Sequence, residues 1–342
     1  MNSERRGAGK FVFGGLPELA ALAALAAGIA LFATIASTQS SAQNPPAVVK
    51  KTAVRSAPGP QVGQQTFPSA AEASAALVAA LKSDDLQALL KVLGQNAREI
   101  IASGDDAADK AERQQIVQKY EEMHRLVVEP DGTTTLYIGA ENWPTPIPLM
   151  HKANEWFFDT AAGKQEILYR RVGRHELATI QVCRELVDAE KEYYALPHDG
   201  DSGQHYAGKF FSDPDKHNGL YWKPVSGEPE SPIGPSIAAA AQEDAGEGAG
   251  QEAQPFEGYY FRMLKAQGPH APGGARSFAE DGKMTSGFAF VAYPAKYRST
   301  GVMTFIVSQD GIVYEKDLGP RTEEIAKKMS RYERDASWRK AD

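Results

Sequence analysis

The spacing of apolar residues changes part of the way along the chain. In residues 66–94 and 108–124, apolar residues recur at helical spacing, which predicts helices. Ser69, followed at the right spacing by Glu72, forms a capping box where the first helix begins. The short segments that follow are rich in β-branched and aromatic residues and are separated by turn residues, which predicts an antiparallel meander. Helices followed by a meander predict an α+β domain over residues 66–170.

In the second half of the chain, a longer helical pattern precedes another group of predicted strands. This helix is predicted to begin at Arg174 and to end before Pro197, and one wide face of it is apolar. Strand-forming segments fill residues 258–316, and the Asp-Gly pair at 310–311 is typical of a hairpin turn. We therefore predict one long helix packed on an antiparallel sheet over residues 171–320.

Two other stretches complete the predicted organisation of the folded part. Residues 237–254 are acidic and low in complexity, so we expect a surface loop inside the second domain. The tail, residues 321–342, is rich in charged residues. We expect this tail to form a closing helix that ends near Trp338.

The N-terminal segment has the pattern of an export leader. Basic residues precede an uncharged apolar run, 19–36, and a small-x-small cleavage site ends at Ala42. This pattern predicts a signal peptide over residues 1–42, with a single N-terminal inner-membrane anchor as the alternative because the run is at the lower limit for a bilayer span. A disordered linker rich in proline and glutamine is predicted at 43–65. The folded part is accordingly expected in the periplasm or cell envelope.

Composition narrows the possible partners more than it narrows the activity. The chain of 342 residues is 42% hydrophobic and 24% charged, as globular proteins are. Its net charge of −7 argues against nucleic acid as a partner, and membrane contact is expected only through the N-terminal apolar segment if that segment is retained. Cys183 is the one cysteine, which excludes an internal disulfide; we expect a buried, inert thiol on the apolar face of the long helix.

Long blocks of the sequence resemble one known family. These blocks include ENWPTPIPL (141–149), WFFDTAAGKQEIL (156–168) and GVMTFIVSQDGIVYEKDLG (301–319). On them the chain is identified as a member of the bacterial secreted family catalogued as domain of unknown function 2950. That resemblance implies no activity. It does imply glutamine at the position of Glu190, which is a departure in this chain.

The order of elements also resembles two known folds. The first half, through KSDDLQALLKVLG (82–94) and EWFFDTAAG (155–163), resembles the cone-shaped fold shared by nuclear transport factor 2 and scytalone dehydratase. The resemblance implies a fold that hosts hydrolases and dehydratases. The second half resembles the globular heads of type IV pilins and pseudopilins. The residues that carry this second resemblance are Thr300, Gly301, Phe305, Asp310, Gly311 and Ile312.

Few residues suggest chemistry. Glu190 falls within the apolar arc of the long helix, where burial would raise the pKa of its carboxyl as in catalytic acids; the alternative is a groove edge or pairing with a basic residue. Asp199, Asp201 and His205 begin a loop dense in metal-ligand types, although Phe210 occupies the twelfth position where a calcium loop needs glutamate. Polar turn residues explain the same composition. We assign no catalytic, cofactor-binding or metal-binding residue.

The sequence contains no recognised catalytic motif, which favours an exported envelope protein acting as a non-catalytic scaffold or binding protein for an envelope protein or polymer. The first alternative is a hydrolase- or dehydratase-like enzyme with its pocket in the first domain. His124, His151 and Asp159 are the polar residues expected to be available to such a pocket. The second alternative is a pilin-like subunit of a surface apparatus. We expect no cofactor in any of the three cases.

Overall fold

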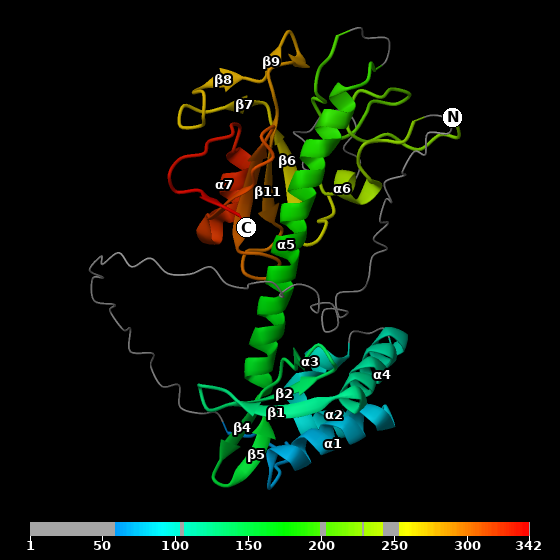
Figure 1. Ribbon diagram of the computed structural model, residues 1–342, viewed down its shortest axis with the longest axis vertical. Coiled ribbons are helices and arrows are strands. Elements are labelled where there is room, and N and C mark those ends of the chain that lie inside the picture. The colour runs from blue at the N-terminus through cyan, green and yellow to red at the C-terminus, as the bar shows by residue number, and fades with distance from the viewer. Residues whose placement is uncertain (1–58, 103–105, 199–202, 228, 242–252, 342) are drawn as a thin grey trace, which may run out of the picture. The chain divides into compact units, whose positions relative to one another are not determined.

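The computed structural model describes residues 59–102, 106–198, 203–227, 229–241 and 253–341 (Figure 1). The chain divides into two compact units, Met1–Ile167 (unit 1) and Leu168–Asp342 (unit 2). Both combine helices with antiparallel sheets, which confirms the predicted α+β class. The predicted leader lies outside the described residues. Within those residues, no helix is both long and apolar enough to span a membrane.

Unit 1 begins with helices that follow the predicted apolar spacing. They are α1 (Ala70–Ser83), α2 (Leu86–Leu93), α3 (Arg98–Ile101) and α4 (Asp106–Glu122), with a short 3-10 turn at Gln95–Ala97. Ser69 Oγ accepts a hydrogen bond from the Glu72 backbone N–H at 3.1 Å, so the predicted helix cap is confirmed. Asp85 caps α2 in the same way through the Gln87 N–H, at 2.8 Å.

An antiparallel sheet follows these helices along the chain. Its strands are β1 (His124–Val128), β2 (Thr134–Ile138), β3 (Trp143–Pro144), β4 (Leu149–Lys152) and β5 (Glu155–Phe158). Their order is β1-β2-β4-β5, and β3 adds to β2. Helices α1 and α2 contact β5, whereas α4 contacts β1 and β2. Leu81, Leu90 and Phe158 belong to the core that these contacts enclose.

The last residues of the predicted linker take part in unit 1. Gln64 Nε2 donates to the carbonyl oxygens of Val92 (3.2 Å) and Phe158 (2.9 Å). The backbone N–H of Gln65 donates to the Lys91 carbonyl oxygen at 2.8 Å. These bonds tie the segment to α2 and β5, because buried backbone groups at the ends of both elements need partners.

The long helix starts earlier than predicted. Helix α5 spans Thr160–Tyr194, and the predicted start at Arg174 is wrong. Asp159 Oδ1 accepts from the Ala162 N–H at 3.1 Å and so caps the helix at its true beginning. Position 163 within the helix is occupied by glycine because Ile147 packs closely against it: a Cβ there would lie 2.6 Å from Ile147 Cγ1. The first residues of α5 belong to unit 1 and the remainder to unit 2.

Unit 2 is built on a second antiparallel sheet. Its order is β14 (Arg339–Lys340), β13 (Tyr314–Asp317), β12 (Met303–Ser308), β11 (Ala289–Pro294) and β6 (Tyr259–Leu264). Two small hairpins lie outside it: β7 (Ala266–Gln267) with β8 (Arg276–Ser277), and β9 (Ala279–Glu280) with β10 (Lys283–Met284). The predicted hairpin is confirmed: β12 and β13 pair, Gly311 has a φ of 74°, and its N–H donates to Ser308.

Helices cover both faces of the unit 2 sheet (Figure 1). Helix α5 lies along one face, and α7 (Thr322–Lys328) contacts β11 on the other. Every residue of β11 is therefore buried. Cys183 of α5 is fully buried in this core, which confirms its expected burial, and burial raises the pKa of its thiol to about 12.

The tail differs from the predicted closing helix. Helix α7 ends at Lys328, and the chain returns as β14, which pairs with β13. The backbone turns extended at Met329, and beyond it Tyr332 and Trp338 are buried against the unit 2 core at 2% and 9% exposure. In the predicted loop at 237–254, the short helix α6 (Pro235–Ala239) takes the first residues, and 242–252 lie outside the described residues.

Candidate functional site

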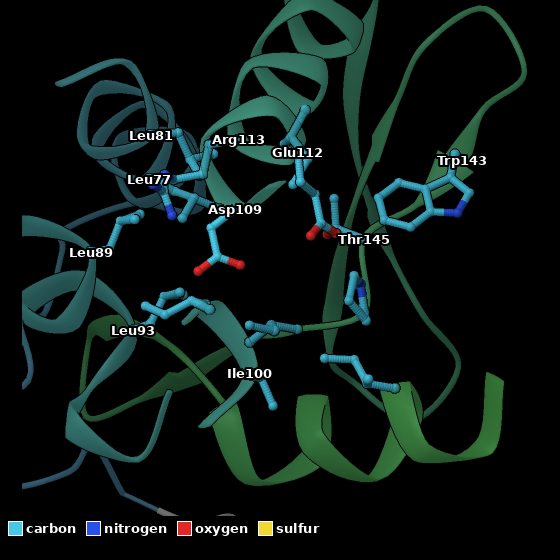
Figure 2. Close-up of a pocket in the computed structure, with 15 residues that line it drawn as sticks. Leu77, Leu81, Leu89, Leu93, Ile100, Asp109, Glu112, Arg113, Trp143 and Thr145 are labelled. Atoms are coloured by element: carbon cyan, nitrogen blue, oxygen red, sulfur yellow. The ribbon is translucent and has the colours of Figure 1, made fainter. Parts of the chain in front are cut away.

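Unit 1 contains a pocket between its helices and the connection from β3 to β4 (Figure 2). The space inside it that the centre of a water molecule can occupy is about 90 Å³. Most of the lining side chains are apolar, and they come from every helix of the unit. These apolar residues are Leu77, Leu81, Leu89, Leu93, Ile100, Ile101, Ile116, Trp143, Pro146, Ile147 and Ile167.

The polar part of the pocket comes mainly from α4. Asp109 lies one turn before the adjacent residues Glu112 and Arg113 on this helix, and Thr145 follows β3. In Figure 2 the Asp109 carboxylate points into the pocket and the Glu112 carboxylate lies beside Thr145. Residues three positions apart share one face of a helix, so both carboxyl groups face the same space.

Glu112 is the most perturbed group in the pocket. Its carboxyl pKa rises to about 7, mainly through burial and further through the nearby Asp109 charge, while Arg113 opposes the rise. Its Oε1 atom is buried and has no hydrogen-bond partner among the described residues. Near neutral pH the group therefore exchanges readily between carboxylic acid and carboxylate.

Arg113 does not neutralise the pocket by pairing with Glu112. Its Nη2 lies 2.7 Å from Asp84 Oδ1, and its Nε donates to the same oxygen at 2.8 Å. Lys110 Nζ is 3.3 Å from the other Asp84 oxygen. These basic partners, led by the hydrogen bond from Arg113, lower the pKa of Asp84. The guanidinium is thus committed to a carboxylate outside the pocket lining.

Thr145 adds an uncommitted hydroxyl to the acidic end. Its Oγ1 is buried and makes no hydrogen bond within the described part of the chain. A buried hydroxyl without a partner costs stability, as does a buried carboxylate oxygen. The pocket therefore combines an apolar body with an acidic end whose polar atoms gain free energy when a ligand supplies hydrogen bonds.

The sequence held a signal for these residues that the apolar pattern hid. In the helix predicted at 108–124, the apolar residues Ile116 and Val117 lie on one side. Toward the N-terminus, Glu112 and Asp109 precede Ile116 at helical spacing and so lie on the same side of the helix. Arg113 precedes Val117 in the same way. Charged residues on the core-facing stripe of a helix mark a pocket or a buried pair, which the composition of α4 as a whole does not show.

The residues expected to serve a first-domain pocket do not line this one. His124 stacks on Tyr120 with ring centroids 3.7 Å apart, and its Nδ1 donates to the Tyr120 carbonyl at 2.9 Å. His151 lies on β4 and packs on Trp156. Asp159 caps α5. The prediction of polar residues inside the first domain therefore names the wrong side chains for the pocket that is present.

Glu190 is fully buried in unit 2. Its Oε2 accepts from the Ala207 N–H at 2.8 Å, and its Oε1 has no partner in the described residues. Burial raises the pKa of this carboxyl well above its usual value, and the bond from Ala207 opposes the rise. The observed contact joins α5 to the segment after it, so the geometry gives Glu190 a structural role; a chemical one stays a prediction.

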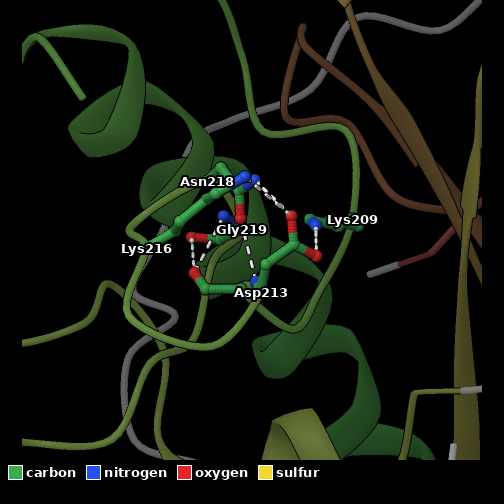
Figure 3. Close-up of polar contacts among 6 residues, drawn as sticks. Lys209, Asp213, Lys216, Asn218 and Gly219 are labelled. Atoms are coloured by element: carbon green, nitrogen blue, oxygen red, sulfur yellow. Dashed lines mark hydrogen bonds and ion pairs between the residues drawn. The ribbon is translucent and has the colours of Figure 1, made fainter. Parts of the chain in front are cut away.

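In the polar loop after α5, the described side chains His205 and Asp213 bind partners within the loop itself. His205 Nδ1 donates to the Tyr206 carbonyl at 3.1 Å, while Asp199 and Asp201 lie outside the described residues. Figure 3 shows Asp213 held by Lys209, Lys216 and Asn218. The hydrogen bond from Lys209 is the main reason that the pKa of Asp213 falls to about 2. No group of three or more metal-ligand side chains occurs among the described residues.

Comparison with known proteins gives a family and no activity. No curated protein and no solved structure matches the chain, so the resemblances to the cone fold and to pilin heads stay predictions. One family model matches residues 64–341, which is most of the chain and nearly all of its described part. The chain belongs to the family described as protein of unknown function DUF2950.

Proposed function

We propose that this chain is an exported binding protein whose unit 1 pocket takes a small, mostly apolar molecule. The observation that carries the proposal is the pocket itself, with leucine and isoleucine walls and one polar end. Ligand sites in proteins are typically apolar hollows with a few convergent polar groups. The absence of a recognised catalytic motif favours binding over catalysis.

The size of the pocket limits the ligand class. The space that the centre of a water molecule can occupy in the pocket is about 90 Å³, which admits a small ligand or an alkyl chain and not a folded protein or a broad polymer surface. An alkyl chain or a small ring system matches the apolar walls. A scaffold that grips an envelope protein or polymer would need a different surface, and this pocket does not supply one.

A blocking variant tests the proposal. A neutral apolar dye such as Nile red, titrated into the purified chain, should bind with a saturable rise in fluorescence and be displaced by octanol. Ile100→Trp should abolish both effects by filling the pocket from α3. The control is Val128→Trp, on an exposed residue of unit 1 at 71% exposure. Equal dye binding by both variants would reject the pocket as a ligand site.

The exported location is a separate part of the proposal, and the leader pattern supports it. N-terminal sequencing of protein taken from cells decides it. A start at Gln43 means that the signal peptide is cleaved, and an intact leader means a retained anchor. A start at Leu16 would instead support the pilin-like alternative, since that is where a prepilin peptidase would cut.

Proton transfer is a second candidate function, favoured by one observation. A carboxyl with a pKa of about 7 is suited to act as both general acid and general base near neutral pH. The dehydratase-like alternative would use Glu112 in that role, not the histidines expected from the sequence. Turnover of a bound ligand by the intact chain, lost in Glu112→Gln while binding persists, would support this function over binding alone.

A further inference from the structure

We infer that the ligand of the unit 1 pocket carries a protonated amine, which Asp109, Glu112 and Thr145 receive while an apolar group fills the leucine and isoleucine walls. This inference rests on the proposed function, because it assigns a ligand class to the same pocket. What it adds is the charged group of the ligand, which lies at the acidic end of the pocket. The three residues lie together in the pocket (Figure 2).

The charges around the pocket favour a cationic ligand. The lining has two carboxyl groups and one guanidinium, and the guanidinium of Arg113 is bound to Asp84. An anionic ligand would meet the carboxyl groups of Asp109 and Glu112, and the cation in the lining, Arg113, already pairs with Asp84. A neutral ligand would leave their mutual repulsion in place. An ammonium group placed between two carboxylates relieves that repulsion.

The unpaired polar atoms favour a ligand with several donors. Glu112 Oε1 and Thr145 Oγ1 are buried and have no hydrogen-bond partners among the described residues. An ammonium group has three N–H donors and no acceptor, whereas a hydroxyl offers one donor. Charge-assisted hydrogen bonds are also about twice as strong as neutral ones. An ammonium group can therefore donate to both atoms and to a second carboxylate at once, whereas an alcohol can donate to Glu112 Oε1 and accept from the Thr145 hydroxyl without offsetting any charge.

A metal ion fits the same end less well. Hard cations take six or more oxygen ligands, and the polar lining here consists of two carboxyl groups and one hydroxyl. The described residues include no cluster of three or more side chains of metal-ligand type. The apolar walls also have no use in binding a bare ion, whereas they match the carbon skeleton of an amine.

Amine binding is coupled to the protonation of Glu112. The charged groups facing it in the pocket are Asp109 and Arg113, both on α4. An ammonium ion binds the ionised carboxylate, so at about pH 6 a bound amine displaces a proton from Glu112. At about pH 8.5 the carboxylate is already ionised and little proton release accompanies binding. Amine affinity therefore rises with pH across this window.

Three ligands of equal chain length test the inference on the purified full chain. Octylamine, octanol and octanoate are compared by isothermal titration calorimetry at about pH 8, where octylamine remains an ammonium ion. Octylamine should bind at least about tenfold more tightly than octanol, since a charge-assisted bond contributes roughly 1.5–3 kcal/mol. Octanoate should bind most weakly. Ile100→Trp should abolish binding of all three, which excludes binding to the apolar leader.

Neutral variants of the acids locate the effect. Glu112→Gln and Asp109→Asn should each lower octylamine affinity about tenfold and leave octanol affinity unchanged. Glu122→Gln, an exposed acid on the same helix, is the matched control and should change neither. At about pH 6, calorimetry in two buffers of different ionisation enthalpy should show proton release by the parent chain and none by Glu112→Gln.

The outcomes separate the inference from the function on which it rests. If octanol and octanoate bind as tightly as octylamine, the amine is rejected while the pocket keeps its proposed function. If Glu112→Gln binds octylamine as the parent does, the inference is also rejected. Thermal unfolding shows that a variant with lower affinity is still folded. If none of the three ligands binds, the proposed function itself is overturned.

Discussion

At the scale of single residues, the carboxyl groups of Glu112 and Glu190 lie in different surroundings. Glu112 in unit 1 lines an open pocket, whereas Glu190 in unit 2 is sealed within a core. Burial raises the pKa of both groups, yet only Glu112 faces a space that a ligand can enter. A raised pKa alone therefore does not identify a functional residue, because desolvation acts equally in a cavity and in a core.

Glu190→Gln should stabilise unit 2 at neutral pH. The folded-state pKa of Glu190 lies above its unfolded value, so the folded state is fully favoured below about pH 4.5 and loses stability as pH rises toward the folded pKa. Glutamine keeps the acceptor for the Ala207 N–H and cannot ionise. The melting temperature of the variant should exceed that of the parent increasingly from about pH 4.5 to pH 8.

Glu192→Gln, exposed on the same helix, is the control for that experiment. Its melting temperature should follow the parent at every pH. A Glu190→Gln variant that melts below the parent at about pH 8 would mean that the carboxylate is needed in ionised form. That outcome would point to a cationic partner for Glu190 and reopen a chemical role.

Asp84→Asn should lower the pKa of Glu112 below its value of about 7. Asp84 has a φ of 54°, which asparagine tolerates, so the backbone is preserved. Arg113 loses a charged partner and can turn toward Glu112, where its positive charge favours the carboxylate. Carbon-detected NMR titration of the glutamate side chains measures this shift, with the Glu112 signal assigned from Glu112→Gln.

Lys110→Gln is the matched control, because it removes the weaker contact to Asp84 and keeps the bond from Arg113. Glu112 should titrate in that variant as in the parent. An unchanged Glu112 pKa in Asp84→Asn would show that the Arg113 side chain is held away from the pocket by packing and not by Asp84.

At the scale of elements, two glycines of α5 have opposite roles. A Cβ at Gly163 would lie 2.6 Å from Ile147 Cγ1, so Gly163→Ala should destabilise unit 1. Gly173 has no atom within 4 Å of such a Cβ, so Gly173→Ala should stabilise the helix by about 0.5–1 kcal/mol. Urea unfolding followed by circular dichroism compares the two; equal effects would mean that Ile147 moves aside freely.

The same helix shows what local pattern predicts and what it misses. The apolar face from Ile180 to Tyr193 was visible, because its periodicity is regular and the face is buried as expected. The start at Thr160 was missed because Gly163 and Gly173 look like helix breaks in sequence. Only the close packing of Ile147 explains why a glycine is needed inside the helix, and that packing is a tertiary contact.

At the scale of the whole molecule, the sequence predicted the α+β class and the family, and it did not predict the site. Strand order follows from short meanders with turn residues such as Asp310 and Gly311, which are local signals. The pocket combines Leu77, Ile147 and Glu112, which are distant in sequence and come together only in the fold. The spacing of Glu112 from Ile116 was a local signal, but the convergence of the three segments has no signature in one sequence.

Solution NMR of the chain with labelled isoleucine and leucine methyl groups, titrated with octylamine, tests the central claim most directly. If the ligand enters the unit 1 pocket, we expect saturable shifts at its lining residues Leu77, Leu93, Ile100 and Ile147 and unchanged signals for Ile306 in the unit 2 core. Shifts confined to unit 2, or no saturable shift in unit 1, would contradict the claim that this pocket is a ligand site.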